Sequence, residues 1–164
     1  MEIDRALVWL QATPLATTIA ENDVLFPWIE SVHVLAIVLV VGTISIVDLR
    51  LIGVASLDRA VSRLMHDVLP FTWGAFVVAA ITGSLLFSSN ATNYAHNFFF
   101  RGKLVLLVLA GLNMALFHLI GVRDIGTWGT KRKTPLAAKA AGGVSLLLWI
   151  LVIGFGRGIG FTMH

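Results

Sequence analysis

Long stretches without a charged side chain dominate the chain. Residues 31–47, 68–95, 104–122 and 140–156 contain no Asp, Glu, Lys or Arg. Each run approaches or exceeds the roughly 17–25 residues that a helix needs to cross the hydrocarbon core. Backbone polar groups in lipid must be satisfied within the segment, and the period-two alternation of a membrane barrel is absent, so these runs predict helices. We expect four membrane spans, at about 28–52, 66–88, 99–122 and 138–157.

A shorter pattern precedes the first span. Apolar residues recur at helical spacing and lie opposite polar ones, which predicts a short amphipathic helix over residues 2–12 on the outer membrane surface. Glu2 and Asp4 stand where a secretory signal would carry basic residues, so this segment is not read as a signal. The expected fold is all-α: an integral membrane four-helix bundle with a short N-terminal interfacial helix, in a single transmembrane domain over residues 1–164.

Composition and charge agree with a membrane protein. Hydrophobic residues make up 57% of the chain and charged residues 13%, against about a quarter in soluble domains. An even number of spans puts both termini on one side. That side carries four basic residues, Arg5, Arg101, Lys103 and Arg157, and the other carries eight, Arg50, Arg59, Arg63, Arg123, Lys131, Arg132, Lys133 and Lys139. The positive-inside rule then predicts a bacterial cytoplasmic membrane protein with both termini periplasmic, and the net charge of +3 indicates orientation rather than nucleic-acid binding.

Four of the five histidines lie at two depths. His33 and His96 fall near the outer ends of the first and third spans, and His66 and His118 near the inner ends of the second and third. If the third helix is continuous from His96 to His118, both rings project from one face about 33 Å apart. That separation is long for electron transfer between two haems. Either His96 hangs from an irregular segment and reaches inward, or one of the sites is not haem.

Imidazole pairs on facing helices suit haem iron, because a neutral ring nitrogen is a good axial ligand and the macrocycle needs an apolar slot. We predict the pairs His33 with His96 and His66 with His118, and two haems. The chain has no cysteine, which excludes covalent attachment and thiolate metal sites and makes any haem b-type. The alternative role of each histidine is a hydrogen bond across helices or interfacial anchoring.

Basic residues near the span ends are candidates to pair with haem propionates, because guanidinium groups recognise carboxylates well. They are Arg101, Lys103 and Arg157 outside, and Arg63 and Arg123 inside. Snorkelling and topology explain them equally well. For Asp48, near the inner end of the first span, topology and capping are favoured over a proton-coupled role beside a quinone. The tryptophans, including Trp73 and Trp149, are interpreted as interfacial anchors.

Two other functional classes stay open. A transition-metal transport component would use membrane histidines but would be expected to add clustered Met or Cys ligands, and only four methionines are present, unclustered. A non-redox structural subunit is the other class. No nucleophile, base and orienting group can be assembled at one depth, so a hydrolase is disfavoured, and whether the chain is an enzyme stays undecided.

Several short motifs carry a resemblance over most of the chain. They are Trp28-Ile29-x-Ser31-x-His33-x-Leu35, Gly42, Asp48-Leu49-Arg50-Leu51-Ile52-Gly53, Phe71-Thr72-Trp73-Gly74, Thr82-Gly83, and Asn113 before His118. This pattern resembles an uncharacterised bacterial family of four-helix integral-membrane proteins. The arrangement is also similar to the four-helix di-haem b-type cytochromes, although His96 and His118 are farther apart than the paired histidines there. The resemblance implies transmembrane electron transfer, with a quinol and a separate redox protein as partners; a homodimer is also considered.

Overall fold

The structure is a computed structural model that describes residues 2–56, 60–121 and 134–162. Every regular element in the described residues is helical. In chain order these elements are α1 (Glu2–Gln11), α2 (Pro14–Glu21), α3 (Leu25–Ile52), α4 (Val61–Ser89), α5 (Ala91–His96), α6 (Phe98–Leu116), the π-helical turn η1 (Phe117–Gly121) and α7 (Leu136–Thr162).

Four helical segments are long and apolar enough to cross a membrane: Leu25–Ile52, Val61–Ser89, Phe98–Leu119 and Leu136–Thr162. They match the four predicted spans, so the all-α four-span architecture is confirmed. The helix predicted over residues 2–12 is also present as α1. The chain is therefore a multi-pass membrane protein in contact with the lipid bilayer.

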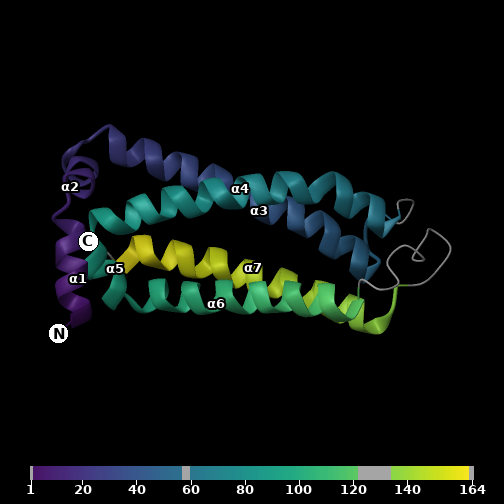
Figure 1. Cartoon of the computed structure of the whole chain (residues 1–164). Helices are drawn as coiled ribbons and strands as arrows, with labels where there is room; N and C mark the ends of the chain where they lie inside the picture. The colour runs from purple at the N-terminus through teal and green to yellow at the C-terminus, as the bar shows by residue number, and fades with distance from the viewer. Residues whose placement is uncertain (1, 57–59, 122–133, 163–164) are drawn as a thin grey trace.

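The four long helices run alongside one another in the order α4, α3, α7, α6 (Figure 1). Helix α3 packs against both α4 and α7, and α6 packs against α7. No pair of Cα atoms from α4 and α6 lies within 8 Å, although both helices are described throughout. The bundle is therefore open along the side where α4 and α6 would otherwise meet.

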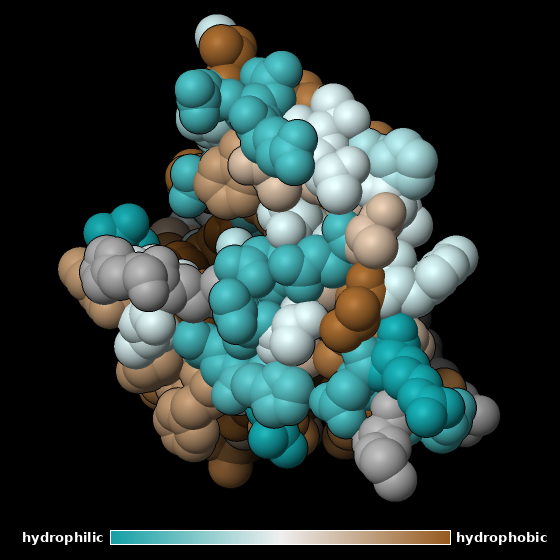
Figure 2. All heavy atoms as spheres, turned by 90° about the vertical axis from the view of Figure 1, so that its left-hand side faces the viewer, coloured by the Kyte–Doolittle hydropathy of each residue, from teal (hydrophilic) through white to brown (hydrophobic). Residues whose placement is uncertain are grey.

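Helices α1, α2 and α5 gather at one end of the bundle, where α7 also ends (Figure 1). Polar side chains cover much of this end (Figure 2). Helix α2 begins with Pro14 at its first turn, and the Thr13 hydroxyl oxygen accepts from the Ala16 N–H at 3.4 Å. Both features favour a helix start, because proline lacks the N–H that a first turn leaves unused and threonine satisfies another.

The opposite end of α3 closes on a glycine. Gly53 has a φ of +91°, a left-handed conformation that side chains rarely adopt, and its N–H donates to the Leu49 carbonyl at 3.1 Å. Nearby, an apolar cluster joins α3, α4 and α7 through Leu51, Val61, Met65 and Ala138, with Phe117 packed against it. This cluster joins three helices at the end of the bundle opposite α1, α2 and α5 (Figure 1).

The premise of a continuous helix from His96 to His118 is wrong. Asn97 separates α5 from α6 with an extended backbone, φ −73° and ψ 126°. Its side-chain oxygen accepts from the Phe100 N–H at 3.1 Å, and its amide donates to the Thr162 hydroxyl of α7 at 2.8 Å. Because these bonds start a new helix at Phe98, His96 belongs to a separate short segment outside the third span.

Interhelical contacts are polar as well as apolar. The Thr72 hydroxyl of α4 donates to the Thr43 hydroxyl of α3 at 2.8 Å, and the Asn113 amide of α6 donates to the Ala141 carbonyl of α7 at 3.0 Å. In lipid such bonds help to hold helices together. Lipid tails are as apolar as the side chains, so hydrophobic burial does not drive one helix to pack on another. The two bonds join α3 to α4 and α6 to α7.

Candidate functional site

A cavity of about 210 Å³ occupies the side of the bundle left open between α4 and α6. We call it the α4–α6 cleft. Its walls come from α4 and from α6 with η1, and its floor from α3 and α7. Apolar side chains form most of the lining, and the polar ones are Asp48, Thr72, Asn113, Ser145 and His118. A mainly apolar pocket with a few convergent polar groups is the usual form of a cofactor or ligand site.

Among the described residues, four aromatic side chains line the cleft. Trp73 and Phe76 come from α4, Phe117 from η1 and Trp149 from α7. Trp73 is 50% exposed and Phe76 40% exposed, so the cleft opens sideways, toward the bilayer in a membrane. Trp73 and Trp149, interpreted from the sequence as interfacial anchors, thus line the cleft inside the bundle.

Asp48 is the buried ionisable group of the cleft. Its side chain is 5% exposed, and Ser145 of α7 lies within hydrogen-bonding reach of the carboxyl group. The Oδ2 atom is buried and has no hydrogen-bond partner among the described residues. An unsatisfied buried oxygen is costly unless something else in the site pairs with it. The Asp48 side chain is therefore buried within the bundle, and the role in topology and capping that the sequence favoured stays a prediction.

His118 stands at the mouth of the cleft in the π-helical turn η1. Its ring Nδ1 lies 2.9 Å from the Met114 carbonyl oxygen. A carbonyl can only accept, so Nδ1 donates, and the Nε2 of the neutral ring carries the lone pair that a metal needs. Such a backbone bond also fixes the orientation of a ligating ring. Isolated π-helical turns occur frequently at functional sites.

A glycine leaves space in the wall contributed by α6. Gly111 lines the cleft, and a Cβ atom added there would meet no atom within 4 Å. Its neighbour Asn113 also lines the cleft. A flat molecule can therefore approach the α6 backbone at this position without displacing protein atoms.

His33 lies near the start of α3, half-buried between α3 and α4. Its Nδ1 is 3.0 Å from the Thr82 hydroxyl. The same hydroxyl lies 2.7 Å from the Val78 carbonyl oxygen, so His33 is held in a polar contact between α3 and α4. Gly83 makes room for the ring, because a Cβ there would be 2.9 Å from His33 Cε1.

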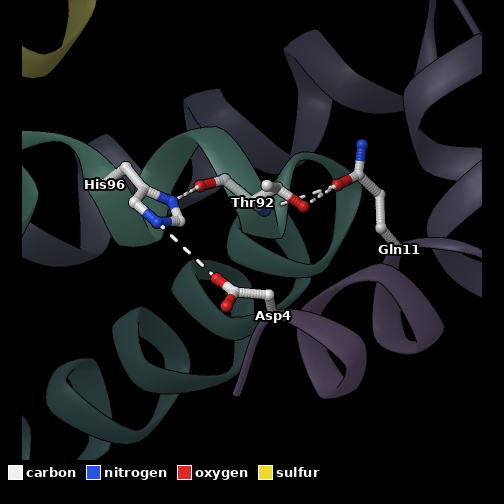
Figure 3. Close-up of polar contacts among 4 residues, drawn as sticks. All are labelled: Asp4, Gln11, Thr92 and His96. Carbon is white, nitrogen blue, oxygen red and sulfur yellow. Dashed lines mark hydrogen bonds and ion pairs between the residues drawn. The ribbon is translucent and has the colours of Figure 1, made fainter. Parts of the chain in front are cut away.

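His96 takes part in a contact between α5 and α1 (Figure 3). Its Nδ1 donates to the Thr92 carbonyl at 2.8 Å, and its Nε2 lies 3.7 Å from Asp4 Oδ1. The Thr92 hydroxyl also donates to Gln11 Oε1 at 3.0 Å. Both ring nitrogens thus have partners that hold the N-terminal helix in place.

His66 points away from the bundle. Its side chain is 91% exposed, and its Nδ1 lies 3.8 Å from Asp67 Oδ1. No hydrogen bond or ion pair between the described residues joins His33 with His96 or His66 with His118. His33 instead contacts Thr82, and His118 contacts the carbonyl of Met114. His96 contacts Thr92 and Asp4, and His66 lies near Asp67. The predicted pairing, and the binding of two haems, stay predictions.

The predicted propionate partners are spread over both ends of the bundle. Arg101 and Arg63 are exposed, Arg157 lies over the Phe161 ring at 5.4 Å, and the Lys103 ammonium lies beside Gly156. Arg123 falls outside the described residues. No group of three or more His, Cys, Asp or Glu side chains able to hold a metal ion occurs within the described part of the chain.

Comparison with known proteins adds no relative. No protein-family model matches the chain, and neither a curated protein nor a solved structure shows significant similarity to it. The resemblance to an uncharacterised bacterial family and the similarity to di-haem cytochromes therefore stay predictions from the sequence.

Proposed function

We propose that the chain is a b-type cytochrome of the membrane, which binds haem b in the α4–α6 cleft with His118 as an axial ligand. The observation that carries this proposal is the state of the His118 ring. Its Nδ1–H is committed to the Met114 carbonyl, which leaves Nε2 free to bind iron at the edge of an apolar slot.

The other residues of the cleft fit the same group. Haem needs a slot that excludes water, and the lining is mostly apolar with aromatic side chains on several walls. The open space beside Gly111 suits the approach of a flat ring. Ferric haem carries a net positive charge at its centre, so the unpaired Oδ2 of Asp48 gains an electrostatic partner when the site is filled.

When bound, haem supplies a one-electron ferric–ferrous couple. The chain's own residues would then hold the iron through His118, keep water out with the apolar walls, and balance charge through Asp48. Because the cleft opens toward the bilayer beside Trp73, we propose a lipid-soluble donor such as a quinol, with a separate redox protein as the second partner. The outer pair, His33 with His96, is not part of this proposal.

The test uses two neighbouring residues of η1. Protein is purified in detergent from haem-sufficient cells as wild type, His118→Ala and Leu119→Ala. Leu119 is the matched control, because it follows His118, is 74% exposed and does not line the cleft. We expect His118→Ala to insert normally but to lose haem, with binding partly restored by added imidazole. We expect Leu119→Ala to keep its haem. Full haem content in His118→Ala would contradict the proposal.

A further inference from the structure

The α4 residues that line the cleft include not the predicted ligand His66 but its neighbour Met65. Adjacent residues on a helix point about 100° apart. Met65 is only 9% exposed and lines the α4–α6 cleft, whereas the His66 side chain is 91% exposed and lies near Asp67. Of these two potential iron ligands, only the methionine lines the proposed haem site.

Met65 and His118 lie on opposite walls of the same cleft. Met65 belongs to the apolar cluster at the end of the bundle opposite α1, and Phe117, the residue before His118, packs against that cluster. The two residues are therefore at similar depth. Helices α4 and α6 have no Cα pair within 8 Å, and the cleft that both residues line lies between them.

Two other possible donors in the cleft, Met114 and Asp48, are less suitable than Met65 as a second iron ligand. Met114 also lines the cleft, but it precedes His118 by four residues on the same helical segment, and its carbonyl already accepts from the His118 ring. A residue in that position lies on the same side as His118 and cannot be opposite it. Asp48 offers a carboxylate from the floor of the cleft, which is a hard ligand better suited to other ions.

We propose that the Met65 thioether is the second axial ligand, opposite His118. This assignment rests on the proposed function, namely that the cleft binds haem b. Methionine and histidine together form a known axial pair for low-spin haem and raise its reduction potential. The sequence alone favoured a histidine pair at this level, and in the structure the neighbouring Met65 lines the cleft.

The test compares Met65→Leu with the matched control His66→Ala in the full-length, haem-containing protein. Leucine keeps the size and apolar character of methionine but has no donor atom, so folding should be preserved. We expect Met65→Leu to keep haem on His118 but to change from six-coordinate low-spin to five-coordinate high-spin. Its sharp reduced α-band and the iron–methionine charge-transfer band of the oxidised protein should be lost. We expect His66→Ala to match the wild type in spectrum and potential.

A third variant, Met65→His, keeps the assignment testable if Met65→Leu folds poorly. It should restore the low-spin spectrum at a lower reduction potential than wild type, because a histidine pair replaces the methionine ligand. An unchanged spectrum in Met65→Leu, with wild-type protein containing haem, overturns only the Met65 assignment. A high-spin haem spectrum in His66→Ala also overturns the Met65 assignment, and it restores His66 as the predicted ligand. A colourless wild type overturns the haem proposal and this assignment together.

Discussion

The Nδ1 atom of His118 donates a hydrogen bond to the Met114 carbonyl oxygen at 2.9 Å. This contact determines which nitrogen of the ring is available to a ligand. With Nδ1 occupied, Nε2 is the ring nitrogen left for a ligand, and the ring sits at the mouth of an apolar cleft. The same cleft contains the buried, unpaired Oδ2 of Asp48. The predictions below follow from these two features and from the contacts that hold the bundle together.

Filling the cleft should remove haem without unfolding the protein. A leucine at Gly111 would extend into open space, because nothing lies within 4 Å of a Cβ at that position. We therefore predict that Gly111→Leu inserts normally and loses most of its haem. Gly154→Leu is the matched control, since Gly154 also has nothing within 4 Å and does not line the cleft. Haem per chain measures the effect, and equal haem in the two variants would show that the ligand binds elsewhere.

Replacing the Asp48 carboxyl group with a neutral amide should make the haem easier to reduce. A carboxylate near the iron favours the ferric state, which carries one more positive charge than the ferrous state. Asp48→Asn removes that preference, so the midpoint potential should rise, on the order of several tens of mV for charges at close range inside a protein. A redox titration followed by absorbance measures this. An unchanged potential would place Asp48 away from the haem.

The contact between α1 and α5 should not affect haem binding. Both ring nitrogens of His96 have partners in Thr92 and Asp4, which argues against their use as iron ligands. We predict that His96→Ala keeps the wild-type haem content. Its stability should be close to that of the wild type, because exposed ion pairs contribute little. If His96→Ala instead lost one haem of two, the predicted outer haem site would be restored.

Because α6 and α7 pack closely at Gly102, even an alanine at this position should destabilise the protein. The Phe155 ring lies against Gly102, in the space that a Cβ would occupy. Gly102→Ala should therefore lower the free energy of unfolding by about 1–3 kcal/mol, the usual cost of overpacking. Gly154→Ala, with no atom within 4 Å of its Cβ, should have little effect. Unfolding in a denaturing detergent, followed by tryptophan fluorescence, would compare them, and equal stabilities would contradict this packing.

Much of the architecture could be predicted from the sequence. Uncharged runs of sufficient length determine the spans, because lipid permits few alternatives to a helix, and the amphipathic N-terminal helix follows from periodicity. The break at Asn97 was harder to predict. It depends on a side-chain cap to Phe100 and a tertiary bond to Thr162, and neither changes the hydropathy of the run.

The candidate site could be predicted only in part. His118 stood out because ionisable groups in a span are unusual. The inward direction of Met65 rather than His66 depends on how α4 is rotated in the bundle, and hydropathy does not report that rotation when lipid and protein interior are equally apolar. The buried position of Asp48 was also hard to predict, because a charged residue near a span end usually lies at the membrane interface. The cleft itself forms because α4 and α6 do not pack against each other, and the hydropathy pattern does not report which helices pack together.

The most direct test of the haem proposal is the absorption spectrum of detergent-purified wild-type protein from haem-sufficient cells. It is recorded oxidised and then dithionite-reduced, with haem per chain from the pyridine adduct. The proposal predicts a sharp reduced α-band and about one haem per chain in the α4–α6 cleft. A colourless protein, inserted and folded but without haem, would contradict it.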